Sequence, residues 1–253
     1  MTHKFRIAEI FGPTIQGEGR RAGIPCHFIR FGGCDYRCVW CDSPQAVLPD
    51  KVAQLPMMTE EQIYDAVRAL PRGPAWVVLS GGNPALLDLH LLCGYLQQNY
   101  SVMVETQGTV YRDWLGYVDE LCVSPKPPSS RNTTSVKVLR NFMQSTYDSP
   151  LHSLGVCYLK VVVFDAVDYD YAREVRKEFP NHLMFLSVGT HHPNMPTVGN
   201  PDVAPVEEYK GMRQQVAQDF RILAETLSKD QLMRDVRVLP QLHVIAWGNE
   251  RGR

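Results

Sequence analysis

The sequence predicts an α/β fold, namely a partial, open parallel β/α barrel of about six strands. Short runs rich in β-branched residues alternate with segments of helical periodicity, a pattern typical of parallel strands joined by crossover helices. Runs such as Val161–Phe164 are apolar at every position, which fits strands buried on both faces. Since about six strands are fewer than the eight of a closed β/α barrel, we expect the barrel to remain open.

Six strands and three helices are expected along the chain. The strands are expected at residues 27–31, 76–80, 102–105, 121–124, 158–164 and 183–188. The helices are expected at residues 59–70, 86–99 and 169–179. Thr59 and Gln62 have the spacing of a capping box, which predicts the start of the first helix. Residues 124–134 and 191–205 are rich in turn formers and are expected to be loops.

Composition favours a single globular unit. The chain has 253 residues, of which 44% are hydrophobic and 21% are charged, so residues 1–253 are expected to form one domain. A net charge of −1 argues against a broad basic surface for nucleic acid or an anionic membrane. The longest run of consecutive hydrophobic residues, Ala75–Leu79, is far too short to span a bilayer. Because the N-terminal residues do not resemble a secretory signal, a cytoplasmic location is expected.

Unusual polar segments follow the predicted strands at their C-terminal ends. These segments are GGCDYRCVWCDSP, SGGNP, ETQGTV, SPKPPSS and SVGTHH. In parallel β/α folds, the loops beyond the strand C-termini build the active site at one rim. The parallel arrangement therefore predicts that these segments converge on one site.

Three closely spaced cysteines, Cys34, Cys38 and Cys41, offer thiolate ligands for a metal centre. A structural zinc site needs a fourth protein ligand, for which His27 and Asp42 are candidates. A 4Fe-4S cluster held by three cysteines instead leaves one iron open to an exogenous ligand. The amino and carboxylate groups of S-adenosyl-L-methionine (SAM) can chelate such an iron, and an electron from the cluster then cleaves the sulfonium.

The cysteine spacing, with Trp40 in the aromatic position before the last cysteine, resembles the signature of the radical SAM superfamily. The segment Ser80–Pro84, SGGNP, resembles the Gly-Gly motif of the same superfamily, in which glycines allow close backbone approach to the cofactor. The superfamily often has an acid where Asn83 stands. The resemblance implies a barrel of the radical SAM type, with a 4Fe-4S cluster bound by a loop at residues 32–44.

Further segments resemble 7-carboxy-7-deazaguanine synthases, most closely their Bacillus-like branch. They are EIFGPTIQGEG, RFGGCDYRCVWCDS, ETQGTVYRDW, SPKPPSS and LPQLHVIAWGNERG. The resemblance implies a lyase that converts 6-carboxy-5,6,7,8-tetrahydropterin into 7-carboxy-7-deazaguanine with release of ammonia, in queuosine and preQ0 biosynthesis and hence the tRNA modification pathway. It also implies regeneration of SAM, a homodimer, a reducing protein such as flavodoxin or ferredoxin, and no direct contact with nucleic acid or a membrane.

The resemblance assigns residues to the cofactors. Cys34, Cys38 and Cys41 would hold the 4Fe-4S cluster, and Ser43 would offer Mg²⁺ a hard oxygen ligand. The expected SAM contacts are Trp40, Gly82, Ser124, Pro125, Lys126, Ser187, Val188, Gly189 and Thr190. One departure is Ser187, which stands where relatives often have Gln.

The resemblance also assigns residues to the substrate. The expected contacts are Ile15, Gln16, Gly17, Glu18, Arg30, Ser80 and His243. Gln16 and an ionised Glu18 suit the guanine-like edge of a pterin, and Arg30 suits a carboxylate. Glu105 is expected to form hydrogen bonds to ribose or substrate, with no role in proton transfer.

Two alternatives are compatible with the cysteine triplet. A glycyl-radical enzyme activase has a similar triplet and a similar size, but is not expected to combine QGEG, ETQG and LPQLH. A non-catalytic zinc-binding module would fill every coordination position of a tetrahedral ion with side chains.

Overall fold

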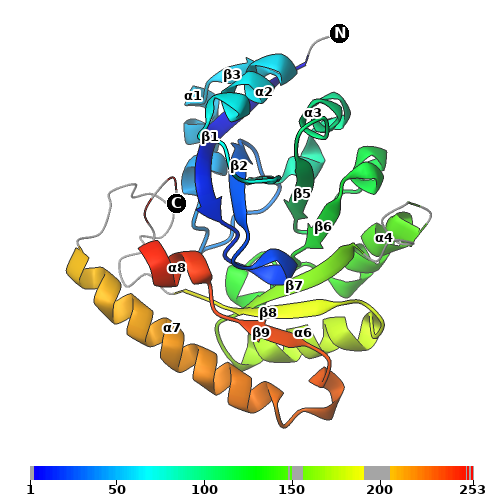
Figure 1. The fold of residues 1–253 in the computed structure, drawn as a ribbon. Helices are drawn as coiled ribbons and strands as arrows, with labels where there is room; N and C mark the ends of the chain where they lie inside the picture. Colours follow the sequence, from blue (N-terminus) through cyan, green and yellow to red (C-terminus); the bar gives the residue numbers. More distant parts are fainter. Residues whose placement is uncertain are drawn as a thin grey trace.

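The computed structural model describes residues 3–147, 149, 156–190, 206–248, 250 and 252, with the backbone alone for 206–210. One nine-stranded sheet runs in the order β3-β1-β2-β4-β5-β6-β7-β8-β9. Figure 1 shows that the sheet curves into an open arc, with the major helices on its outer side. This arrangement brings the inner faces of distant strands toward one another.

The sheet and its helices have the following bounds. The strands are β1 Lys4–Ile15, β2 Pro25–Phe31, β3 Met57–Thr59, β4 Trp76–Gly81, β5 Ser101–Thr106, β6 Glu120–Val123, β7 Cys157–Val163, β8 Met184–Val188 and β9 Arg237–Leu239. The α-helices are α1 Pro49–Gln54, α2 Glu60–Ala69, α3 His90–Leu96, α4 Val136–Tyr147, α6 Ala166–Glu178, α7 Val206–Leu227 and α8 Leu242–Trp247.

All six predicted strands are present, as β2 and β4 to β8, and they pair in parallel as predicted. Three strands were not predicted. The strand β1 covers part of the segment at residues 9–19, which was expected to precede the first strand. It pairs antiparallel with β2 through two irregularities in register, which interrupt the alternation that marks a strand in a sequence. The strands β3 and β9 have three residues each, too few to show a period.

The three predicted helices are present with altered bounds. The capping box of α2 is formed, since Thr59 Oγ1 accepts from Gln62 N at 3.3 Å and Gln62 Oε1 accepts from Thr59 N at 2.9 Å. The helix expected at 86–99 is the shorter α3, whose His90 N donates to Asp88 Oδ1. The helix expected at 169–179 is α6, which begins earlier because Asp165 caps its N-terminus.

Four helices, α1, α4, α7 and α8, were not predicted. The helices α1 and α8 have six residues each, too few for a clear helical period. Among the side chains described in α7, those of Met212, Val216 and Leu223 are buried hydrophobic groups, a sparse apolar stripe for a helix of this length. The expected loop at 191–205 lies outside the described residues.

The six parallel strands repeat one three-residue order of side chains. The first residue is apolar and belongs to an inner cluster: Phe28, Val78, Met103, Cys122, Tyr158 and Phe185. The next is apolar and belongs to the outer core under the helices: Ile29, Leu79, Val104, Val123, Leu159 and Leu186. The third is polar and returns to the inner face, because side chains alternate along a strand: Arg30, Ser80, Glu105, Ser124, Lys160 and Ser187. An apolar floor therefore lies below a polar layer.

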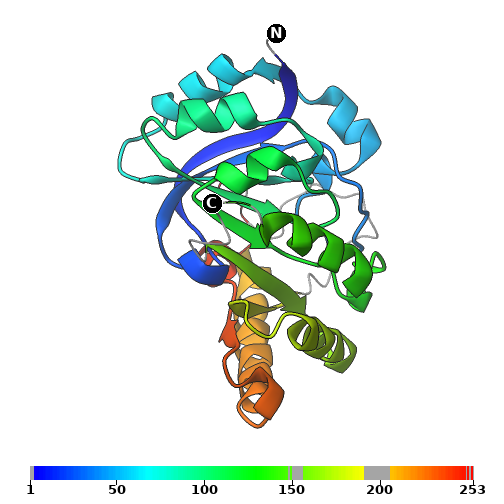
Figure 2. The same cartoon turned by 90° about the vertical axis from the view of Figure 1, so that its right-hand side faces the viewer.

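The helices complete the outer core. The helix α6 packs against β7, and α7 packs against β8 and β9. Seen from the perpendicular direction, the long α7 runs down beside the C-terminal strands (Figure 2). Within the described part of the chain, no helix combines the length and apolar character needed to cross a bilayer.

Replacing Thr59 by alanine should lower the free energy of unfolding by about 1 kcal/mol, because the first turn of α2 loses its capping hydroxyl. Urea denaturation followed by circular dichroism measures this change. Thr226→Ala is the matched control, since Thr226 lies near the end of α7 and donates to Ile222 O within the helix. A loss of equal size in both variants would contradict the capping role.

Candidate active site

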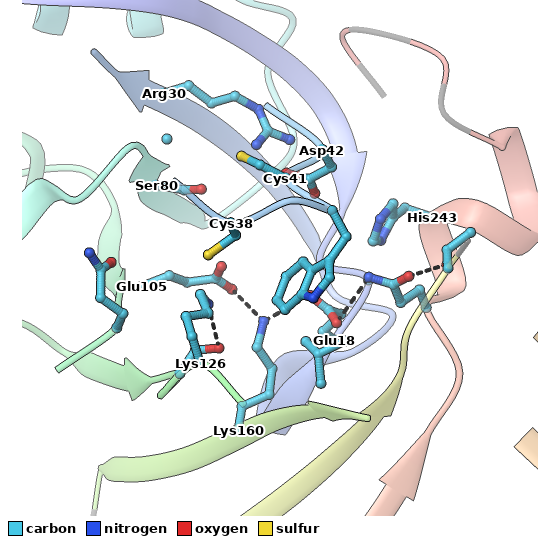
Figure 3. A pocket seen from close by; sticks show the side chains of 18 of the residues that line it. Glu18, Arg30, Cys38, Cys41, Asp42, Ser80, Glu105, Lys126, Lys160 and His243 are labelled. Carbon is cyan, nitrogen blue, oxygen red and sulfur yellow. Dashed lines mark hydrogen bonds and ion pairs between the residues drawn. The ribbon is translucent and has the colours of Figure 1, made fainter. Parts of the chain in front are cut away.

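One pocket opens at the C-terminal ends of the parallel strands. The polar layer supplies part of its lining through Arg30, Ser80, Glu105, Ser124 and Lys160. Figure 3 shows the side chains of Arg30, Ser80, Glu105 and Lys160 entering the pocket from different strands. The convergence predicted for the loops after the strands is therefore present in the structure.

The three closely spaced cysteines line this pocket from the loop after β2. None of them is in a disulfide. Burial raises the pKa of all three thiols, to about 12 for Cys41, while Lys126 opposes the rise at Cys34 and Cys38. Lys126 therefore places a positive charge near the thiolates, which would be negative when they bind a cluster.

The three thiols offer the donors that an iron-sulfur cluster needs. Cysteines that bind a 4Fe-4S cluster attach to different irons, so their sulfurs need not meet at one point. Of the two candidate fourth zinc ligands, His27 packs against Tyr100 with ring centroids 6.1 Å apart, whereas Asp42 lines the pocket with the cysteines. The three thiols thus fit the cluster by donor type and shared pocket.

Most of the residues expected to contact SAM lie beside the cysteines. The ones that line the pocket are Trp40, Gly82, Ser124, Lys126 and Thr190. The ones that do not line it are Pro125, Ser187, Val188 and Gly189. A side chain at Gly82 would collide with the cysteine loop, since its Cβ would lie 1.9 Å from Gly33 O. Only a glycine at position 82 therefore allows the Gly-Gly loop to lie this close to the cysteine loop.

All seven residues expected to contact the substrate line the pocket. The backbone N of Leu242 donates to Gly17 O at 3.0 Å, which holds the segment after β9 against the segment after β1. A Cβ at Gly17 would lie 1.9 Å from His243 Nδ1, so His243 packs directly on this glycine. Burial lowers the pKa of His243, although Glu18 opposes the shift, and this favours a neutral imidazole at pH 7.

Lys160, which was not predicted as a site residue, links two carboxylates in this pocket. Its Nζ lies 2.8 Å from Glu18 Oε2 and 3.7 Å from Glu105 Oε1 (Figure 3). Glu105 Oε1 also accepts from Gln16 Nε2 at 2.9 Å, and Glu18 Oε1 accepts from Gln241 Nε2 at 3.2 Å. The lysine side chain is 4% exposed, so its charge depends on these partners.

Lys160 and Glu18 hold each other ionised. Burial alone would raise the pKa of Glu18, but Lys160 and His243 lower it to about 2. Burial alone would lower the pKa of Lys160, but Glu105 and Glu18 raise it well above its ordinary value. An ionised Glu18 at neutral pH agrees with the expectation from the sequence.

Arg30 is held in place by groups on three sides. Its Nε lies 3.2 Å from Glu9 Oε2, its Nη1 donates to Ser43 Oγ at 2.8 Å, and its guanidinium lies over the ring of Phe11 at 5.5 Å. Ser43 is buried behind the pocket lining and donates to Asp42 Oδ1 at 3.0 Å. The guanidinium is therefore fixed before any anion binds.

Comparison with known proteins identifies the family. The chain is 38% identical to the 7-carboxy-7-deazaguanine synthase of Bacillus cereus over 252 residues, which cover 98% of this chain and 99% of that relative. It is also 38% identical to the synthase of Bacillus subtilis over 251 residues, or 97% of either chain. This chain belongs to the 7-carboxy-7-deazaguanine synthase family.

The fold of this family member is also similar to a solved structure. The crystal structure of QueE from Escherichia coli covers 95% of this chain and of its own, with a TM-score of 0.65 and 21% sequence identity. The similarity confirms the predicted fold class. A search of family models found no match.

Sequence reasoning missed several pocket residues of this family member. They are Lys160, Thr106, Gln107 and Gln241. One signal was available for Lys160: a charged residue inside an apolar strand, two positions after an inward Tyr158, must face the interior. Gln107 and Gln241 lie beyond the ends of strands, so the alternation of side chains along a strand does not predict where they point.

Lys160→Met should lower the free energy of unfolding by about 1–3 kcal/mol at pH 7, because it leaves two partly buried carboxylates without their cation. Wild-type protein keeps Glu18 ionised down to about pH 2, so this contribution is lost as pH falls from about 4.5 toward 2. In the variant, burial should raise the pKa of Glu18, so Glu18 takes up a proton as the pH falls. The difference in the free energy of unfolding between the variant and the wild type should then become smaller.

Urea denaturation between pH 8 and pH 4 measures this gap. Lys177→Met, a change at an exposed site on α6, is the matched control and should leave stability nearly constant across the range. A gap for Lys160→Met that does not depend on pH would contradict the coupling between Lys160 and Glu18.

Proposed function

We propose that this family member is a radical SAM lyase that converts 6-carboxy-5,6,7,8-tetrahydropterin into 7-carboxy-7-deazaguanine. The reaction balances by release of one ammonia, and it belongs to queuosine and related 7-deazapurine biosynthesis. The observation that carries the proposal is a single pocket in which the cysteine triplet faces all seven residues expected to contact the substrate. Full-length similarity to curated synthases supports the same reaction.

Two halves of the pocket have the chemistry for cofactor and substrate. Cys34, Cys38 and Cys41 would hold the 4Fe-4S cluster, and Lys126 and the Gly82 loop lie beside them for SAM. Cluster and SAM together supply the radical that removes a hydrogen atom from the substrate. The residues expected to contact the substrate, which line the same pocket, would bind and orient the pterin.

The substrate half combines fixed charges of both signs. Arg30 is already oriented by Glu9 and Ser43, so it can bind the substrate carboxylate with little further ordering. Lys160 holds Glu18 ionised, and Glu105 Oε1 lies 3.7 Å from the same ammonium. Both carboxylates can accept hydrogen bonds from the N–H groups of a pterin edge. His243 adds a neutral ring above Gly17.

Magnesium would bind beside Arg30. Ser43 Oγ and the neighbouring Asp42 offer hard oxygen ligands next to the guanidinium that we assign to the substrate carboxylate. This position fits an ion with few protein ligands, the others being substrate oxygens and water.

The remaining expectations form part of the same proposal. The sheet takes strands from Lys4 to Leu239, which supports a single domain over residues 1–253. We propose a cytoplasmic homodimer that receives electrons from a reducing protein such as flavodoxin or ferredoxin. No direct contact with nucleic acid is proposed, because the net charge is −1.

Anaerobically reconstituted protein, given SAM, a reductant, Mg²⁺ and the carboxytetrahydropterin, should form a product with the mass of the deazapurine. Cys38→Ala should lose both iron and turnover while keeping the fold, because this residue lies in a rim loop. Cys93→Ala is the matched control, since Cys93 is buried in α3 and should not affect iron content. Release of 5′-deoxyadenosine without deazapurine would refute the substrate while leaving radical SAM chemistry in place.

Arg30→Lys should raise the KM for the carboxytetrahydropterin by about tenfold or more, because a lysine keeps the charge but cannot form paired hydrogen bonds to a carboxylate. Initial rates at saturating SAM measure KM and kcat separately. Arg112→Lys is the matched control, since Arg112 donates to the backbone oxygens of Ala85 and Leu86, outside the pocket lining. An unchanged KM in the Arg30 variant would remove Arg30 from substrate binding.

A further inference from the structure

The loop that carries the cysteines is tied to two other rim loops at one carboxylate. Asp35 follows the first cysteine of the triplet. Its Oδ1 accepts from Asn83 Nδ2 at 2.9 Å and from Gln107 Nε2, and its Oδ2 accepts from Thr109 Oγ1 at 2.6 Å. Asn83 follows β4 and the other two donors follow β5, so three segments meet at this side chain.

The surroundings of Asn83 fix the direction of its amide. Its Oδ1 accepts from Ala85 N at 3.2 Å and from Thr106 Oγ1 at 2.8 Å. The side chain is 1% exposed, so its NH₂ group must find acceptors inside the protein, and it does so at Asp35. The backbone N of Asn83 also donates to Gly33 O at 2.7 Å, which adds a second link to the cysteine loop.

Gln107 connects this carboxylate to a cluster ligand. Its Nε2 donates to Asp35 and lies 3.5 Å from Cys34 Sγ. The residue is 4% exposed, so its position is set by the protein. The side chain of Gln107 thus links the sulfur of Cys34 to the Asp35 carboxylate.

We propose that Asp35 is a positioning residue for the cluster, and that with Asn83 it forms an acid and amide pair that holds the cysteine loop against the cofactor side of the pocket. An acid at position 83, which the wider superfamily often has, would face the Asp35 carboxylate and repel it. In this chain the acid is Asp35 on the cysteine loop, and the amide is Asn83 on the Gly-Gly loop. The proposal rests on the proposed function, because it takes the cysteines to hold a cluster.

The reciprocal exchange of the two side chains provides the test. The single variant Asp35→Ala removes the carboxylate that accepts from Asn83, and Asn83→Asp places two acids face to face, so each removes the hydrogen bond of the pair. The double variant Asp35→Asn/Asn83→Asp keeps one acid and one amide, and a carboxylate at position 83 still suits the donors Ala85 N and Thr106. Thr109→Val removes the hydroxyl that donates to Asp35 Oδ2 and accepts from Asn83 Nδ2.

Cluster retention and potential are measured on reconstituted protein under anaerobic conditions. Each single variant should release iron to a chelator about tenfold faster than wild type or more, the usual effect of losing a partner behind a metal ligand. The exchange should reverse part of this loss, because it restores the pair but does not restore the acceptor for Gln107, and Thr109→Val should show a smaller loss. Asp35→Asn should also shift the cluster potential to less negative values, because a charge near Cys34 is lost.

Two controls separate the possible failures. Asp170→Asn, at a side chain that is 75% exposed on α6, should change neither iron release nor potential. If the wild-type protein assembles no cluster, the proposed function fails and this inference fails with it. If the wild type assembles a cluster but Asp35→Ala releases iron at the wild-type rate, or the exchange is no better than Asn83→Asp alone, only the role of Asp35 is refuted.

Discussion

The period of side chains along parallel strands is the constraint on which the site depends. In each of the six strands an inward apolar residue is followed two positions later by an inward polar one, as with Met103 and Glu105 on β5. A slip of one residue would turn Glu105 outward and bring Val104 into the pocket. Because Val104 is fully buried under the outer helices, the hydrophobic core itself fixes which side chains face the substrate.

The polar layer also needs a balance of charge. Lys160 alone would not stay ionised at such low exposure, and Glu18 and Glu105 alone would repel each other. Together they form a charged group that survives above an apolar floor that includes Tyr158 and Met103. Stability and function are linked here, because the lysine that keeps Glu18 ionised also fixes where Glu18 and Glu105 can accept hydrogen bonds.

The sequence allowed the six parallel strands, the common rim and the cysteine loop to be predicted, because each has a local pattern. Arg30 and Ser80 were assigned through resemblance to the family, and the structure brings both to the pocket. Lys160 and Asp35 were missed because their partners are remote: Lys160 meets Glu18 across 142 residues, and Asp35 meets Thr109 across 74. The strand β1 was missed because its bulges break the alternation with which strands are recognised.

The incomplete barrel explains why the segment after β1 and the segment after β9 meet in the pocket. In the sheet order β1 lies near one edge and β9 at the other, and no strand pairing joins these edges among the described residues. The segments beyond them are joined instead through Leu242 N and Gly17 O, and through Gln241 and Glu18. If strand pairing closed the barrel, the backbone N–H and C=O groups of these segments would bond to neighbouring strands. Closure by loops and side chains leaves groups such as His243 to face the pocket, so the same segment completes the barrel and lines the site.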